Sequence, residues 1–178
     1  MKTEKTAFSN APTGVATPPK TRRTDRVFVS LGSNQGDRAA YLETARHRLA
    51  ARSDIRVVRL SSVLENRALL YADQPDFLNQ VLEIRTDLSP WDLLRFFKST
   101  ESDMGRKTRF RYGPREIDLD ILSWEGLRLD QEELTLPHPG LRDRPYLHEL
   151  LAELGESALK LADGELADGE LAREGDRA

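Results

Sequence analysis

The sequence predicts an α+β fold with a ferredoxin-like βαββαβ core, in which helices pack on an antiparallel sheet and an extra C-terminal helix follows. Two observations support this class. Between residues 26 and 159, segments rich in β-branched and apolar residues alternate with helix-like segments in that order. The chain also has 178 residues, of which 38% are hydrophobic and 32% charged, enough for one soluble domain with its own core.

The first half of this core begins with a predicted strand at 26–31 (RVFVSL), where β-branched and aromatic residues dominate. After the Gly-containing turn GSNQGD, residues 39–51 are predicted as a helix because their apolar residues recur on one face. Residues 55–64 are predicted as the second strand. Residues 77–86 (FLNQVLEIRT) alternate strongly and are predicted as the third strand.

Capping residues define the second helix. Ser89 is a preferred N-cap residue and Pro90 is favoured at the first helical position, so the helix is predicted to begin there. It is predicted to run to about Met104, because Gly105 lies where a C-terminal cap belongs.

The rest of the core is predicted as a fourth strand at 117–123, a turn at Glu125-Gly126 and a short return strand at 127–129. Arg144-Pro145 then leads into a last helix at about 146–154.

Both ends of the chain differ in composition from the domain at 26–159. Residues 1–25 are rich in Thr, Pro, Lys and Arg without periodicity, which predicts a disordered N-terminal arm. Residues 160–178 contain LADGE twice in tandem and are predicted as an acidic low-complexity tail.

Composition restricts the function classes. A net charge of −3 argues against a protein coated with basic residues for nucleic acid, so an anion site would be local. No apolar run approaches the ~20 residues of a membrane span, and no membrane partner is expected. The absence of cysteine excludes disulfides, thiolate metal sites and a cysteine nucleophile, and a cytoplasmic location is expected.

Two acidic residues stand on the fourth predicted strand. Because side chains alternate along a strand, Ile117, Leu119 and Ile121 point to one face, while Asp118 and Asp120 point together to the other. Such hard oxygen ligands suit Mg²⁺, which completes its shell with water and substrate phosphates. The alternative is an amphipathic strand with an acidic solvent face.

A basic run lies just before this strand and consists of Arg106, Lys107, Arg109, Arg111 and Arg115. Arginine matches phosphate oxygens with a two-pronged fork, and the glycines at 105 and 113 allow the loop to close. The alternative is a solvated charged loop. Carboxylates and arginines together indicate phosphoryl-transfer chemistry.

Other candidates are individually less specific. His138 lies between two prolines and is either a phosphate ligand or structural. Phe77 and Asn79 share a strand face, where a ring beside an amide can stack on a flat heterocycle and read its edge. Tyr112 and Tyr146 are further candidate ring contacts, although each aromatic residue is also a candidate for the core.

These residues together resemble a known family. The segments VSLGSN, DQPDFLNQV, ESDMGR, RYGPREIDLDIL and LTLPHPGLRDR occur in the order of the 6-hydroxymethyl-7,8-dihydropterin pyrophosphokinases, and the likeness covers about 26–155. That family transfers pyrophosphate from ATP to the hydroxymethyl group of the pterin and releases AMP in folate synthesis. The resemblance therefore implies a Mg²⁺-dependent enzyme that acts on two small molecules as a monomer.

The resemblance also implies roles for individual residues. Asp118 and Asp120 would hold two Mg²⁺ ions, with Arg106 and Arg115 as the catalytic arginines. The ATP site would be formed by Glu101, Arg106, Arg115, Ile121, Thr135, His138 and Arg144. The pterin site would be formed by Gly32, Leu69, Phe77, Asn79, Tyr112 and Tyr146.

The chain departs from the family pattern in three places. Residues 65–71 (ENRALLY) replace a Pro-rich turn, Glu133 stands where some members have arginine, and Lys98 where some have glutamine. Two other readings stay open: a nucleic-acid-binding module on a ferredoxin-like sheet, and a family member that has lost catalysis.

Overall fold

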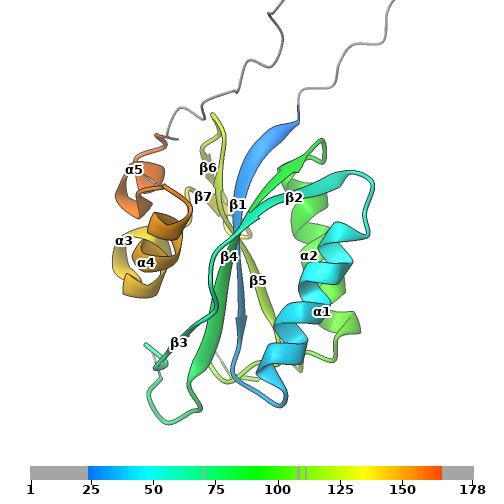
Figure 1. Ribbon diagram of the computed structural model, residues 1–178, viewed down its shortest axis with the longest axis vertical. Coiled ribbons are helices and arrows are strands. Elements are labelled where there is room, and N and C mark those ends of the chain that lie inside the picture. The colour runs from blue at the N-terminus through cyan, green and yellow to red at the C-terminus, as the bar shows by residue number, and fades with distance from the viewer. Residues whose placement is uncertain (1–23, 70, 108, 111, 166–178) are drawn as a thin grey trace, which may run out of the picture.

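The computed structural model describes residues 24–69, 71–107, 109–110 and 112–165 (Figure 1). The predicted N-terminal arm at 1–25 and acidic tail at 160–178 lie largely outside the described residues. Among these residues, no helix is both long and apolar enough to cross a membrane.

A sheet of antiparallel pairs forms the centre of the domain, which confirms the α+β class. Its order is β2 (Ile55–Leu60), β4 (Phe77–Thr86), β1 (Asp25–Ser33) and β5 (Asp118–Trp124). The short β3 (Leu64–Asn66) pairs with the beginning of β4. β1 and β4 are therefore the central strands, and their residues are almost all buried.

Helices cover both faces of this sheet (Figure 1). α1 (Arg38–Ala50) and α2 (Pro90–Asp103) lie on one face. α3 (Gly140–Asp143), α4 (Pro145–Glu153) and α5 (Ala158–Ala162) lie on the other. The two faces form separate apolar clusters, because alternate residues of each strand point in opposite directions.

The capping predictions for α2 are confirmed. Ser89 Oγ accepts the N–H of Asp92 at 3.1 Å, Pro90 is the first helical residue and Met104 is the C-cap. Gly105 follows with a φ of +84°, a left-handed conformation that favours glycine.

Two predicted elements differ in the structure. The strand predicted at 55–64 is divided into β2 and β3, because Ser61 turns its hydroxyl toward β4 and accepts the N–H of Val81 at 2.9 Å. The return strand predicted at 127–129 is instead β6 (Leu129–Asp130). It pairs with β7 (Thr135–Leu136) and not with β5. α3, β7 and α5 were not predicted, because each has at most five residues and shows little periodicity.

A buried ionic cluster joins the segment between α4 and α5 to the sheet. Glu83 on β4 accepts from Arg26 Nε at 2.8 Å and from Arg59 Nε at 2.6 Å, and Arg26 also pairs with Glu156. Burial opposes ionisation of Glu83, but the hydrogen bonds from both arginines outweigh it, so its pKa lies below the ordinary value. Its contribution to stability is therefore complete above the ordinary glutamate pKa and is lost as pH falls through the lowered one.

We expect Glu83→Gln to lower the free energy of unfolding by about 3 kcal/mol, because it leaves buried arginine charge without its main partner. Urea denaturation at neutral pH measures this loss. Glu65→Gln is the matched control, since the Arg38–Glu65 pair is exposed and such pairs contribute about 1 kcal/mol or less. Equal losses in both variants would contradict the assignment.

Candidate active site

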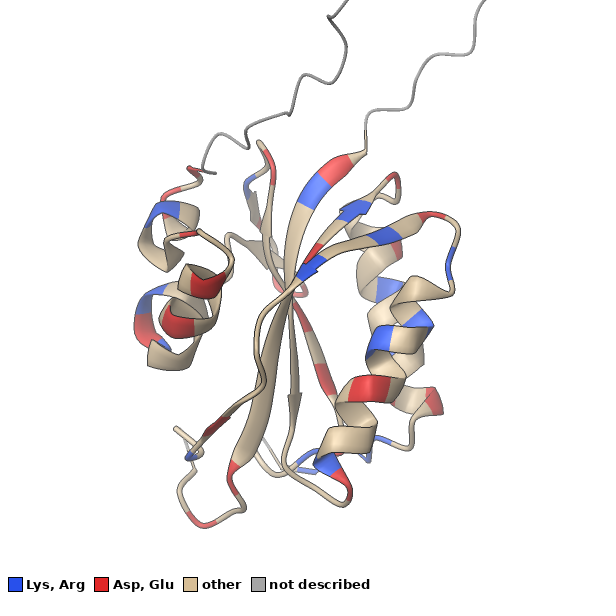
Figure 2. Ribbon diagram, viewed as in Figure 1, with Lys and Arg blue, Asp and Glu red and all other residues tan. Residues whose placement is uncertain are grey.

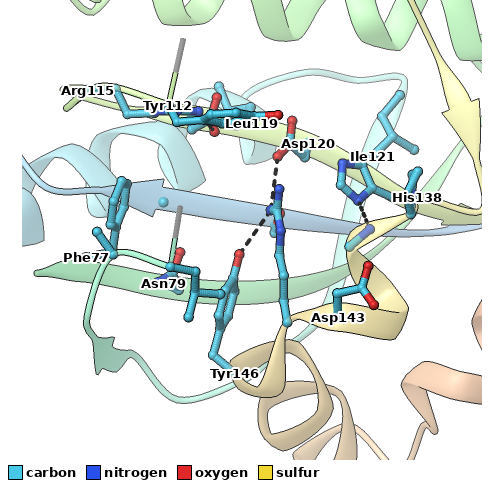
Figure 3. A pocket seen from close by; sticks show the side chains of 18 of the residues that line it. Phe77, Asn79, Tyr112, Arg115, Leu119, Asp120, Ile121, His138, Asp143 and Tyr146 are labelled. Atoms are coloured by element: carbon cyan, nitrogen blue, oxygen red, sulfur yellow. Dashed lines mark hydrogen bonds and ion pairs between the residues drawn. The ribbon is translucent and has the colours of Figure 1, made fainter. Parts of the chain in front are cut away.

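The main cavity of the described structure has a volume of about 830 Å³ and opens beside the sheet face that carries α3 and α4. This size suits small-molecule substrates. All predicted site residues but Glu101 line it: Gly32, Leu69, Phe77, Asn79, Arg106, Tyr112, Arg115, Asp118, Asp120, Ile121, Thr135, His138, Arg144 and Tyr146. Figure 3 shows Phe77 and Asn79 on one side and Tyr112 and Arg115 on another, with His138 farther along.

Strand register places the two carboxylates in this cavity. Asp118 lies opposite Gly32 of β1, and Asp120 lies opposite Ser30. Ile117, Leu119 and Ile121 belong to one apolar cluster and the two carboxylates belong to none, which agrees with the predicted alternation. Leu119 and Ile121 also reach the wall of the cavity.

Gly32 is required by the close approach of Asn79, its partner on β4. A Cβ atom at Gly32 would lie 2.9 Å from Asn79 Oδ1. Because Gly32 has no side chain, the Asn79 amide can lie against the backbone of β1 at the cavity wall. Asn79 Nδ2 donates to Asn66 Oδ1 at 2.6 Å, which orients the amide.

The loop before β5 brings two guanidinium groups to Asp118. Arg106 Nη1 lies 2.7 Å from Asp118 Oδ1, and Arg115 Nη1 lies 2.5 Å from Oδ2. Burial opposes ionisation of this carboxyl, but Arg115 and Arg106 outweigh it and hold its pKa below the ordinary value. Figure 2 shows this meeting of acidic positions on β5 with a basic loop.

The negative charge of Asp120 is less well compensated by arginines than that of Asp118. Its nearest ion-pair partner is Arg144, 3.9 Å from Asp120 Oδ2, and Arg144 Nη1 also donates to the Tyr146 hydroxyl at 3.2 Å. Burial, and secondly the charge of Asp118, raise the pKa of Asp120. A cation near Asp120 would relieve both effects.

Asp118 and Asp120 could form part of a divalent-cation site. Within the described ranges, no group of three or more His, Asp or Glu side chains could hold a metal. Asp118 and Asp120 supply hard oxygen donors on one strand face, and Mg²⁺ commonly completes such a pair with water and phosphate oxygens.

His138 has one defined tautomer. Its Nδ1 accepts the backbone N–H of Gly140 at 2.9 Å, so the neutral ring carries its proton on Nε2. Burial lowers the pKa of His138 and favours this neutral form, in spite of the opposing charge of Asp120. The ring is therefore a hydrogen-bond donor at the cavity wall.

Glu101 differs from its expected placement. The residue is 3% exposed, and its carboxylate accepts the N–H of Leu119 at 2.8 Å and lies 2.6 Å from Arg106 Nη1. It lines a second, basic cavity of about 490 Å³ beneath the loop before β5 and not the main one. Glu101 therefore pairs with Arg106 from the side of α2. Lys98, one turn earlier on α2, lies 3.1 Å from the Glu101 carboxylate and lines both cavities.

Sequence reasoning assigned no role to Asn34 and Gln74, whose side chains join the loops around the cavity. Both lie in segments already singled out, GSNQGD and DQPDFLN. The sequence offers no other indication of their role than these neighbouring turn residues, because most of their hydrogen-bond partners are distant in sequence.

A cavity that joins paired carboxylates, arginines and an aromatic–amide wall defines a class of enzyme that moves a phosphate-containing group onto a small ring-bearing acceptor. Residues 28–156 match the family model of 7,8-dihydro-6-hydroxymethylpterin-pyrophosphokinase. The chain belongs to this family, and its activity is pyrophosphate transfer to hydroxymethyldihydropterin in folate synthesis.

Curated relatives agree with this assignment. The 2-amino-4-hydroxy-6-hydroxymethyldihydropteridine pyrophosphokinase of Bacillus subtilis is 37% identical over 143 residues, which cover 80% of this chain and 86% of that protein. The protein of the same name from Methylorubrum extorquens is 42% identical over 72% of this chain and 82% of its own length. Folic acid synthesis protein fol1 of Schizosaccharomyces pombe is 44% identical over 70% of this chain, but the match covers 17% of that longer protein.

Proposed function

We propose that ATP donates the pyrophosphate in the main cavity, that AMP leaves, and that the reaction depends on two Mg²⁺ ions held by Asp118 and Asp120. The observation that carries the proposal is the convergence of this carboxylate pair with Arg106 and Arg115 beside Phe77 and Asn79. One end of the cavity suits a polyanion and the other suits a flat ring.

The residues at the phosphate end neutralise charge. Attack on the β-phosphorus of ATP spreads negative charge over oxygens that Arg106 and Arg115 can reach from their positions beside Asp118. Asp118 and Asp120 would hold Mg²⁺, which would supply further positive charge and lower the pKa of the attacking hydroxyl. His138 and Arg144 add donors along the nucleotide side, with Thr135 and Ile121 lining the same wall.

The residues at the pterin end would recognise the flat shape of the pterin ring and the hydrogen-bonding groups along its edge. Phe77 offers a ring face, and Asn79 offers an amide whose orientation is set by Asn66. Tyr112 and Tyr146 line the same space from the loop before β5 and from α4, and Leu69 contributes an exposed apolar side chain. A hydrogen-bonded ring edge next to apolar contacts is the arrangement that selects a heterocycle.

The proposal extends to the architecture and state of the protein. The strand order β2-β4-β1-β5, with α1 and α2 on one face, supports a ferredoxin-like core. A cytoplasmic monomer remains our expectation, and sedimentation at several protein concentrations tests the monomer.

The test is the identity of the nucleotide product. The protein, ATP, Mg²⁺ and 6-hydroxymethyl-7,8-dihydropterin are incubated, and nucleotides are separated by ion-exchange chromatography. We expect AMP that depends on both the pterin and Mg²⁺, and no AMP in excess EDTA. ADP as product would replace the proposal with simple phosphoryl transfer, and AMP formation unaffected by EDTA would remove the metal assignment.

A further inference from the structure

Asn34, the first residue after β1, joins two segments that flank the cavity. It is 1% exposed. Its Nδ2 donates to Gln74 Oε1 and to the Pro75 carbonyl, both at 3.0 Å. Its Oδ1 accepts the backbone N–H of Arg115 at 2.8 Å, and its own backbone N–H donates to the Arg115 carbonyl at 3.1 Å.

These partners require an amide at this position. The Arg115 N–H can only donate and the Pro75 carbonyl can only accept, so one end of the side chain must accept and the other must donate. Aspartate would place an oxygen against the Pro75 carbonyl, and alanine would leave buried polar groups without partners.

Gln74 extends the connection to the loop before β5. Its Nε2 donates to the carbonyls of Tyr71 at 2.7 Å and Tyr112 at 3.0 Å. The rings of Tyr71 and Phe110 also meet edge to face, with centroids 5.0 Å apart. The segment before β4 and the segment before β5 are therefore joined to each other as well as to Asn34.

The two segments present opposite parts of the site. Arg115 carries the guanidinium beside Asp118, whereas Pro75 leads directly into Phe77 and Asn79 on β4. Figure 3 shows Arg115 across the cavity from Phe77 and Asn79. We propose that Asn34 is a positioning residue that sets the spacing between the phosphate-binding arginine and the pterin-binding wall; the naming of these two subsites rests on the proposed function.

The test compares Asn34→Ala and Asn34→Asp with Gln80→Ala. Gln80 is a matched control because it is 3% exposed and its amide is hydrogen-bonded, to the Ser61 carbonyl at 2.7 Å and to Arg46 Nη1 at 3.1 Å. Neither of these partners lies in the two segments that Asn34 joins. Thermal unfolding, kcat, and hydrogen exchange of the Arg115 amide are measured for each variant. Asn34→Asp preserves the side-chain volume and serves if alanine prevents folding.

We expect both Asn34 variants to lower kcat about 100-fold, because small misplacements of reacting groups have effects of this size. Exchange of the Arg115 amide should be about tenfold faster or more in Asn34→Ala, which lacks its acceptor. Gln80→Ala should lose comparable thermal stability with kcat unchanged. A loss of kcat in the Gln80 variant equal to that in the Asn34 variants would overturn the proposal.

A partner variant gives a second, independent test. Asn34→Asp and Gln74→Ala disrupt the same connection, so their combined effect on kcat should be smaller than the product of the separate effects. Fully multiplicative effects would contradict a shared role. Amide exchange does not depend on turnover, so unchanged Arg115 protection would overturn the positioning role alone, whereas absence of AMP in the unmodified protein would overturn the proposed function alone.

Discussion

Asp120→Ala and Asp118→Ala should each lower kcat for pyrophosphoryl transfer at least ~1000-fold, which corresponds to about 4 kcal/mol of transition-state stabilisation. The physical reason is the position of both carboxylates on one face of β5, opposite Gly32 and Ser30 and directly in the cavity. Among the described residues, the arginine paired with Asp120 is Arg144 at 3.9 Å, so Asp120 is the better placed of the two to take a cation.

The fold should survive both substitutions. Asp118 and Asp120 lie at the cavity wall with side chains 17% and 27% exposed, and neither belongs to an apolar cluster. The measurements are initial rates with AMP detection, and circular dichroism melting as the folding check. Asp130→Ala on β6 is the control, because Asp130 is exposed and lies outside the cavity. Activity within about tenfold of the unmodified protein in both β5 variants would refute the metal assignment.

Local patterns predicted the elements whose signals are complete within one segment. β4 has the predicted bounds, Phe77–Thr86, because its apolar residues and its flanking turn residues agree. The end of the second strand was missed, since the turn at Ser61 depends on a hydrogen bond to Val81, twenty residues away. The β6–β7 pair was missed for the same reason: two-residue strands are defined by their partners.

The candidate site shows the same division. Alternation alone places Asp118 and Asp120 on one face, and composition alone identifies the basic loop. Alternation cannot show that Asn79 stands beside Gly32, since that depends on the register of β1 with β4. The burial of Glu101 against Arg106 likewise follows from the packing of α2 against β5, and a sequence motif carries no information about that packing.

Arg115→Ala should slow the chemical step more than it weakens ATP binding. The Arg115 guanidinium lies 2.5 Å from Asp118 and lines the main cavity, where the proposed reaction would develop charge on the transferred group. We expect the single-turnover rate to fall ~100- to 1000-fold, about 3–4 kcal/mol, with a change in ATP Kd of about tenfold or less. Arg115→Lys should recover only part of the rate, because an ammonium group lacks the planar fork.

Arg109→Ala is the matched control, since it removes an arginine from the same loop whose charge is used elsewhere. Its guanidinium pairs with Glu116 at 2.6 Å, a hydrogen bond that lowers the pKa of Glu116 to about 2, and it does not line the main cavity. Rapid-quench measurements under single-turnover conditions separate the chemical step from binding. If Arg115→Ala raised only the ATP Kd and left the single-turnover rate unchanged, Arg115 would bind the ground state alone, and charge stabilisation would fall to Arg106 and the cations proposed at Asp118 and Asp120.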